Sequence, residues 1–325
     1  MKRIACLMMS LAIVGTLCAA PAHANEKVRF MLASVPDLPS FALMRIAKYA
    51  GYYKDEGLDV EFLTGKGGVD AATQIAAGNA DVSEGMGDTA MIVRANEVPS
   101  RGIMLIGNGS VTSIAVRADS GIKSPKDLKG KSVSVISFAD TTYYSLLGVL
   151  GSVGLTKNDV DIQALGNVGM VQAFLSGKVQ ALATVPDFLP IVEDAGVKMR
   201  IFNASTYTPS LAQALLASDD YIAKHPEAVR GIVAGTMRAF RKYRNDPEAM
   251  AKIYVKAAPA HKDEEPKMAR IFTYYSKLAY GGEQKNLGRF DPVKLKALQD
   301  FYHKIGIVRN ESPVSDLYTN KFVPK

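Results

Sequence analysis

Residues 51–82 constrain the fold more than any other stretch of this 325-residue chain. They read as a tight turn, a strand at 58–63, a Gly-rich bend at 65–68 and a helix with Ala71 and Ile75 on its apolar face. Glycine lets a backbone approach a ligand closely, and a helix N-terminus after such a bend offers unpaired N–H groups. At the carboxyl end of a strand in an open sheet, this arrangement predicts a ligand-binding element.

Strands and helices alternate along the chain, a pattern typical of parallel sheets flanked by helices. The polar stretches 108–112 and 207–212 interrupt this pattern, and we interpret them as two crossings between lobes. They divide the chain into a discontinuous lobe 1, residues 25–111 and 212–325, and an inserted lobe 2, residues 112–211. The predicted strands are 28–34, 58–63, 81–84, 101–106, 113–117, 131–137, 161–165, 179–184 and 213–218. The predicted helices include 69–77, 89–95, 141–151 and 168–176, others that start at Pro226, Asp246-Pro247 and Asp291-Pro292, and a short capped helix at Ser124-Pro125.

The first 24 residues read as a signal peptide rather than as part of the fold. Lys2 and Arg3 precede the apolar run 4–20, and residues 22–24 form an A-x-A cleavage site. The alternative is an uncleaved membrane anchor, since the run approaches the length of a short membrane span. We expect cleavage, a mature chain that begins at Asn25, and a periplasmic location.

Composition excludes several classes of function. Both cysteines, Cys6 and Cys18, lie in the leader, so the mature chain has no thiol for catalysis or zinc binding. The formal charge falls from +7 to +5 when Lys2 and Arg3 leave with the leader. That charge forms no polybasic block, so we expect no nucleic-acid partner.

The histidines do not indicate an enzyme. His225, His261 and His303 lack the spacing of a metalloprotease motif and have no nucleophile beside them. The acidic run 263–265 could attract a cation, but a solvated helix start explains it better. We therefore expect no catalytic residue, no metal and no cofactor.

Four segments carry a resemblance to a known family. They are residues 51–82, which read GYYKDEGLDVEF, then G-x-G-G, then AAGNADV; residues 122–135, IKSPKDLKGKSVSV; residues 164–183, ALGNVGMVQAFLSGKVQALA; and residues 218–230, SDDYIAKHPEAVR. Together they resemble the nitrate/sulfonate/taurine branch of periplasmic ABC-importer binding proteins. The resemblance implies the α/β two-lobe periplasmic binding protein fold of type II, with a ligand cleft between two mostly parallel sheets. It also implies a monomer that delivers a small-molecule ligand to an ABC permease.

Loops at the carboxyl ends of strands would form the walls of such a cleft. The resemblance implies ligand contacts in the same loops. The capping of helices is an alternative role for Asp37, Asp88 and Asp140. The predicted ligand-binding residues are Asp37, Ser40, Gly67, Gly68, Asp88, Thr89, Asn108, Asp140, Thr141, Thr142, Tyr143 and Asp187.

The predicted site carries donors and carboxyl groups together. Gly67, Gly68 and the hydroxyls of Thr89, Thr141 and Thr142 could bind an anion. Carboxylates in the same loops, including Glu84, would repel a bare anion but suit an ammonium group or the N–H edge of a heterocycle. Tyr52, Phe138, Tyr143 and Phe188 could stack on a ring.

We therefore expect capture of a small polar organic solute, similar to a sulfonate, taurine or nitrate, by hinge closure. The first alternative is a binder of a thiamine-pyrimidine or riboflavin-like heterocyclic precursor. A more remote alternative is a thiamine-pyrimidine synthase-like enzyme, which needs a histidine and typically cysteine and iron. A sensory ectodomain would need a membrane anchor or a fused partner.

Overall fold

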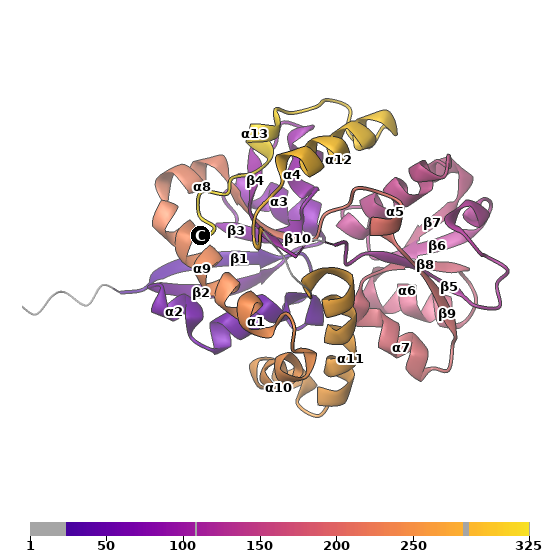
Figure 1. Cartoon of the computed structure of the whole chain (residues 1–325), viewed down its shortest axis with the longest axis horizontal. Coiled ribbons are helices and arrows are strands. Elements are labelled where there is room, and N and C mark those ends of the chain that lie inside the picture. Colours follow the sequence, from indigo (N-terminus) through magenta and orange to yellow (C-terminus); the bar gives the residue numbers. More distant parts are fainter. Residues whose placement is uncertain (1–23, 108, 282–285, 325) are drawn as a thin grey trace, which may run out of the picture.

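The computed structural model describes residues 24–107, 109–281 and 286–324, which form two lobes side by side (Figure 1). Each lobe has one five-stranded sheet, ordered β2-β1-β3-β10-β4 in lobe 1 and β7-β6-β8-β5-β9 in lobe 2. The strands are β1 (Glu26–Leu32), β2 (Leu58–Thr64), β3 (Val82–Met86), β4 (Ser100–Ile106), β5 (Ser113–Arg117), β6 (Ser132–Val135), β7 (Asp161–Ala164), β8 (Ala181–Thr184), β9 (Met199–Asn203) and β10 (Gln213–Ser218). The predicted two-lobe α/β fold is confirmed.

The helices cover both faces of each sheet (Figure 1). They are α1 (Ala42–Tyr49), α2 (Tyr52–Asp55), α3 (Gly68–Ala76), α4 (Thr89–Arg94), α5 (Thr141–Ser152), α6 (Gly166–Leu175), α7 (Leu189–Asp194), α8 (Asp219–Lys224), α9 (Pro226–Tyr243), α10 (Pro247–Ala257), α11 (Glu265–Tyr275), α12 (Pro292–Lys304) and α13 (Val314–Leu317). In the parts of the chain that the structure describes, no helix combines the length and the apolar character needed to cross a membrane.

One strand in each sheet runs against the others, and its position explains how the lobes face each other. β10 pairs antiparallel with β3 and β4, and β5 pairs antiparallel with β8 and β9. Both reversed strands directly follow a crossing between the lobes, so they start at the gap and run away from it. The parallel strands consequently end at the gap, which places their following loops between the lobes.

The predicted helix starts are correct where a side chain caps the helix. Asp246 accepts a hydrogen bond from Ala249 N at 2.9 Å, and Asp291 accepts one from Val293 N at 2.8 Å. Ser124 begins the predicted short helix through a capping box. In each of these helices proline occupies the first turn, where its missing N–H costs nothing.

One strand and several short helices of the structure were not predicted from the sequence. β9 lies at the edge of the lobe 2 sheet and includes the exposed Arg200, so it lacks the apolar run of a central strand. The short helices α7 and α8 were also not predicted. Lobe 1 contains the sheet of β1–β4 and β10, and lobe 2 contains the sheet of β5–β9. Of the predicted leader, Ala24 alone lies within the described residues.

Candidate functional site

A small cavity lies where the two lobes meet, and both lobes line it. The volume of this cavity is about 40 Å³. The lining residues are Ala33, Ser34, Leu38, Ser40, Phe41, Glu84, Met86 and Gln213 from lobe 1, and Ile136, Asp140, Thr141, Thr142, Val185 and Phe188 from lobe 2. Most of them follow β1, β6 and β8, and Glu84 and Met86 belong to the end of β3, so the arrangement of strand ends produces this cavity.

The Gly-rich bend brings the lobes into direct contact. Gly67 has φ +129°, and a Cβ placed there would lie 2.3 Å from the carbonyl oxygen of Ala139 on lobe 2. Ser137 Oγ donates to the carbonyl of Lys66 at 3.0 Å, and Val69 N donates to the carbonyl of Ala139 at 3.3 Å. The predicted ligand-binding bend therefore serves as a contact between lobes, and the protein is in a closed arrangement.

Asp187 joins the lobes beside the cavity. Its carboxyl accepts hydrogen bonds from Ser40 Oγ at 2.5 Å, Ser40 N at 3.1 Å and Tyr275 Oη at 2.8 Å. Asp187 belongs to lobe 2, whereas Ser40 and Tyr275 belong to lobe 1. Burial raises the pKa of Asp187 above its usual value, although these hydrogen bonds act in the opposite direction. Ser40 thus lines the cavity and Asp187 lies beside it, and the two predicted ligand contacts bind each other.

Glu84, on β3, is the most perturbed acid that lines the cavity. Its Oε1 accepts from Gln213 Nε2 at 3.2 Å, and Tyr280 Oη donates to Gln213 Oε1. The other oxygen, Oε2, is buried and has no partner in hydrogen-bond geometry, while the backbone of Ala33 lies close enough to the carboxyl to lower its pKa. Burial raises the pKa of Glu84 to about 8, and the charges of Asp140 and Asp187 contribute. A carboxyl that lines a cavity and has such a raised pKa is a candidate ligand contact.

Asp140 caps α5, one of the two roles considered for it, and it also lines the cavity. Its Oδ1 accepts from Thr142 N at 2.8 Å and from Thr142 Oγ1 at 2.5 Å. Burial raises its pKa, against the effect of those two bonds. The predicted ligand contacts Thr141 and Thr142 line the cavity, and Thr141 also packs against Gly68, where an added Cβ would lie 3.0 Å from Thr141 Cγ2.

Asp88 and Thr89 lie behind the cavity wall rather than on it. Tyr302 Oη donates to Asp88 Oδ2 at 2.7 Å, while Asp88 Oδ1 is buried without a partner. Burial raises the pKa of Asp88 to about 6, and the Tyr302 hydrogen bond partly offsets that effect. Thr89 Oγ1 accepts from Met86 N at 2.9 Å, which holds the turn after β3.

Other predicted residues lie outside the cavity. The carboxyl of Asp37 is half exposed and pairs with Arg45 at 2.9 Å. Tyr143 does not line the cavity and packs edge-on against Phe138 and Tyr144. Asn108 lies outside the described residues. Of the residues predicted to stack on a ring, Phe188 is the one that lines the cavity.

Gln213, Phe41 and Met86 line the cavity but were not among the residues predicted for the site. Gln213 is the first residue of β10, directly after the second predicted crossing, so its place at the gap could have been inferred from the strand reversal. Phe41 and Met86 gave no signal beyond ordinary core patterning. Glu84 was recognised as a carboxyl in these loops but was not chosen as a ligand contact.

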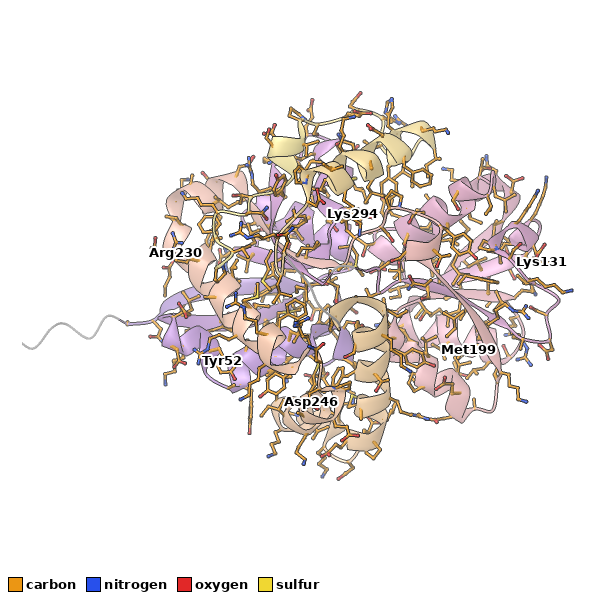
Figure 2. The ribbon with its side chains drawn as sticks, viewed as in Figure 1. Tyr52, Lys131, Met199, Arg230, Asp246 and Lys294 are labelled. Carbon is orange, nitrogen blue, oxygen red and sulfur yellow. The ribbon has the colours of Figure 1, made fainter. Side chains whose placement is uncertain are left out.

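The described part of the cavity wall contains no lysine, arginine or histidine side chain. Basic residues such as Arg230 on lobe 1 and Lys131 on lobe 2 lie toward the outer ends of the molecule (Figure 2). The wall therefore combines apolar side chains, hydroxyls and the two acids Glu84 and Asp140.

Fold and cavity together define the two-lobe fold of periplasmic binding proteins. A family model described as NMT1/THI5 like matches residues 38–250, more than half of the chain, so the chain belongs to that family. This result agrees with the family predicted from the sequence motifs.

Two curated relatives have names that indicate binding. The riboflavin-binding protein RibY of Chloroflexus aurantiacus is 22% identical over 306 residues, covering 92% of this chain and 86% of RibY. A putative binding protein of Brucella abortus is 26% identical over 283 residues, covering 84% of this chain and 85% of the relative.

Two solved structures show how widely this fold is used. The alkanesulfonate-binding protein SsuA from Xanthomonas axonopodis pv. citri, bound to MOPS, has a TM-score of 0.73 at 16% identity and covers 92% of this chain and 99% of SsuA. The desulfurization enzyme DSZB has a TM-score of 0.60 at 15% identity and covers 92% of this chain and 97% of that enzyme. The likeness to both shows the fold.

Proposed function

We propose that this chain is the extracytoplasmic solute-binding component of an ABC importer, which captures a small polar organic solute by closing its two lobes. The observation that carries the proposal is the cavity, because its wall is contributed by both lobes. A ligand in contact with both lobes gains affinity when they close, and that difference in affinity shifts the population toward the closed state.

The composition of the cavity wall favours a solute that offers N–H donors. In their ionised forms Glu84 and Asp140 would repel a bare nitrate or an alkanesulfonate, whereas an ammonium group or the N–H edge of a heterocycle matches their acceptor oxygens. Phe41 and Phe188 add apolar surface suited to a ring. This combination favours the heterocyclic alternative or a taurine-like zwitterion over a simple anion, in line with a riboflavin-binding relative.

The export signal supports the cellular role. A leader with a cleavage site at residues 22–24 would deliver the mature chain to the periplasm, where the closed protein, as a monomer, would dock on a permease. Since both cysteines would leave with the leader, the alternative of an iron-dependent enzyme lacks its thiols. A hydroxyl group needs an adjacent base to act as a nucleophile. The described wall of the cavity has no histidine that could serve as this base, which favours binding over catalysis.

The test is a thermal-shift screen of the mature chain with taurine, an alkanesulfonate, nitrate, 4-aminopyrimidine and riboflavin. A ligand at 100 times its dissociation constant stabilises the folded state by about 2.7 kcal/mol. Small-angle X-ray scattering with each hit should show a decrease in the radius of gyration. A scattering curve unchanged by every solute in the screen and by a periplasmic extract would contradict capture by closure.

A further inference from the structure

We propose that the cavity recognises a cationic nitrogen group, such as an ammonium or an amidinium, and that this group binds between Glu84 of lobe 1 and Asp140 of lobe 2. The inference rests on the proposed function, because it specifies the chemistry of the solute for the same cavity. It also explains how the charge of the solute would contribute to lobe closure.

The hydrogen bonds around Glu84 leave one oxygen for the ligand. Tyr280 Oη donates to Gln213 Oε1, so the amide nitrogen of Gln213 points to Glu84 Oε1 and to the carbonyl of Ser40, at 3.2 and 3.0 Å. Oε1 therefore acts as an acceptor. Oε2 is buried and has no partner, and a buried acceptor in that state is costly unless a donor reaches it. A ligand N–H would satisfy it.

The second acid comes from the opposite lobe. Asp140 at the start of α5 lines the same cavity, and its charge acts on Glu84 strongly enough to raise the Glu84 pKa. Closing the lobes therefore brings two acids together inside an apolar wall. Among the described lining residues no basic side chain compensates them, so a proton on Glu84 relieves their repulsion in the empty closed form, and a cation between them would take the place of that proton.

An anionic group fits the same atoms poorly. Asp140 Oδ1 already accepts two bonds from Thr142, and Glu84 Oε1 accepts one from Gln213. A sulfonate could be held there only if each acid stayed protonated and donated its single hydrogen to the ligand. The existing hydrogen bonds already hold the oxygens of Glu84 and Asp140 as acceptors, so a cationic donor can bind them without changing those bonds.

Binding of a cation by this pair is linked to proton release. Glu84 is neutral at pH 7 when its pKa is about 8, and it must give its proton to solvent to bind the cation as a carboxylate. The titratable groups that face it are Asp140 at the N-cap of α5, Asp187 from the 3-10 helix Pro186–Phe188, and Tyr280 at the end of the π-helix Ser276–Tyr280. Asp187 is in turn influenced by Tyr275 and His261.

The test uses three small probes of one shape and different charge: acetamidinium, acetamide and acetate. We expect acetamidinium to bind the mature chain at least tenfold more tightly than acetamide, measured by NMR titration, and acetate to bind least. Because Glu84 must lose its proton, acetamidinium affinity should rise by up to about tenfold per pH unit between pH 6 and 8 and level off above that.

Two variants separate this role from a structural one. Glu84→Gln should weaken acetamidinium tenfold or more and abolish the pH dependence, while Asp140→Asn, which keeps a helix-capping acceptor, should weaken it without unfolding the chain. The control Asp37→Asn changes an acid outside the cavity and should leave the affinity unchanged. Circular dichroism verifies that each variant is folded.

Several outcomes would overturn the inference: acetate binding as well as acetamidinium, none of the probes binding, or Glu84→Gln retaining the wild-type affinity. A failure of this inference can be distinguished from a failure of the proposed function. If a screened solute closes the lobes while Glu84→Gln has no effect on acetamidinium, solute capture stands and the cation site does not. If acetamidinium binds as expected but no solute closes the lobes, the proposed function fails instead.

Discussion

The carboxyl of Asp187 accepts two hydrogen bonds from one residue of the opposite lobe, Ser40, through its hydroxyl at 2.5 Å and its backbone N–H at 3.1 Å. Ser40 also lines the cavity. A single residue therefore touches both the space for a ligand and the carboxyl that joins the lobes. Tyr275 Oη lies 2.8 Å from the same carboxyl and 2.9 Å from Ser40 Oγ, so its one hydroxyl hydrogen can bond either acceptor. Both acceptors are present together only when the lobes are closed.

We predict that Asp187→Asn weakens binding of any solute that closes the lobes. An amide that keeps its oxygen on Ser40 presents N–H groups to Tyr275 Oη, so the closed state loses the bond that Tyr275 donates to this carboxyl and the tyrosine can donate only to Ser40 Oγ. The net loss of that bond costs about 1–1.5 kcal/mol, roughly tenfold in affinity. Isothermal titration calorimetry with a solute from the thermal-shift screen measures it.

The matched control is Asp194→Asn, which alters an exposed contact between the lobes. Asp194 pairs with Arg270 at 2.7 Å, and both side chains are about half exposed. Surface ion pairs contribute about 0–1 kcal/mol, so the affinity should fall by only a few-fold. Equal losses in the two variants would mean that Asp187 has no special role in closure.

A second prediction concerns Gly67→Ala, which should prevent full closure. The added Cβ would lie 2.3 Å from the carbonyl oxygen of Ala139, a contact that exists only when the lobes meet. The φ of +129° at Gly67 also disfavours alanine, by roughly 1–3 kcal/mol. We expect ligand affinity to fall more than tenfold and the radius of gyration to stay large after ligand is added.

Gly57→Ala separates strain from clash. Gly57 has φ +75°, and a Cβ added there would have no other atom within 4 Å, so its substitution strains the backbone without blocking the other lobe. This variant should lose thermal stability yet close normally on ligand. If Gly67→Ala also closes normally, the contact with Ala139 yields easily and the prediction is wrong.

The course of the chain could largely be predicted from its sequence, because apolar runs and capping residues act locally. Asp140 caps α5 and Asp246 caps α10 as the sequence indicated. Side-chain directions were harder to predict. Asp37 follows β1 as a cleft residue should, but its carboxyl pairs with Arg45, one turn into α1. Glu84 lies within β3 rather than in the loop after it, and only the fold shows that Gln213 meets it.

The third prediction is that Glu84→Gln has the same folding stability as wild type at low pH and a higher stability at high pH. The pKa of Glu84 is raised from 4.5 to about 8, so the folded state holds this proton more tightly than the unfolded state does. Wild-type stability should therefore fall as pH rises between about 4.5 and 8. Glutamine cannot ionise, so the variant should match wild type near pH 5 and exceed it at pH 9 by up to a few kcal/mol.

Thermal melts across this pH range measure the effect, with the exposed Glu61→Gln as the control that should follow wild type. Parallel curves for wild type and Glu84→Gln would show that Glu84 ionises as freely as a surface acid. That result would also remove the basis for proton release on ligand binding.

The fourth prediction uses two buried tyrosines that differ in the charge of their partners. Tyr302 donates to the carboxyl of Asp88 at 2.7 Å, whereas Tyr53 pairs with the hydroxyl of Thr236 at 2.8 Å. The pKa of Asp88 is about 6, so above that pH Tyr302 stabilises a buried carboxylate. Its loss in Tyr302→Phe should cost about 1.5–3 kcal/mol at pH 8, because bonds to charged groups are the stronger ones.

At pH 5 Tyr302→Phe should lose less folding stability than at pH 8, because Asp88 is then protonated and no longer needs a hydrogen-bond donor to stabilise its charge. The bond favours the ionised form, so its contribution appears as pH rises through about 6. Tyr53→Phe removes a bond between neutral groups and should cost about 0.5–1.5 kcal/mol at both pH values. Urea denaturation of the two variants at pH 5 and pH 8 measures the difference, and the same loss for Tyr302→Phe at both would show that Asp88 does not change its charge in this range.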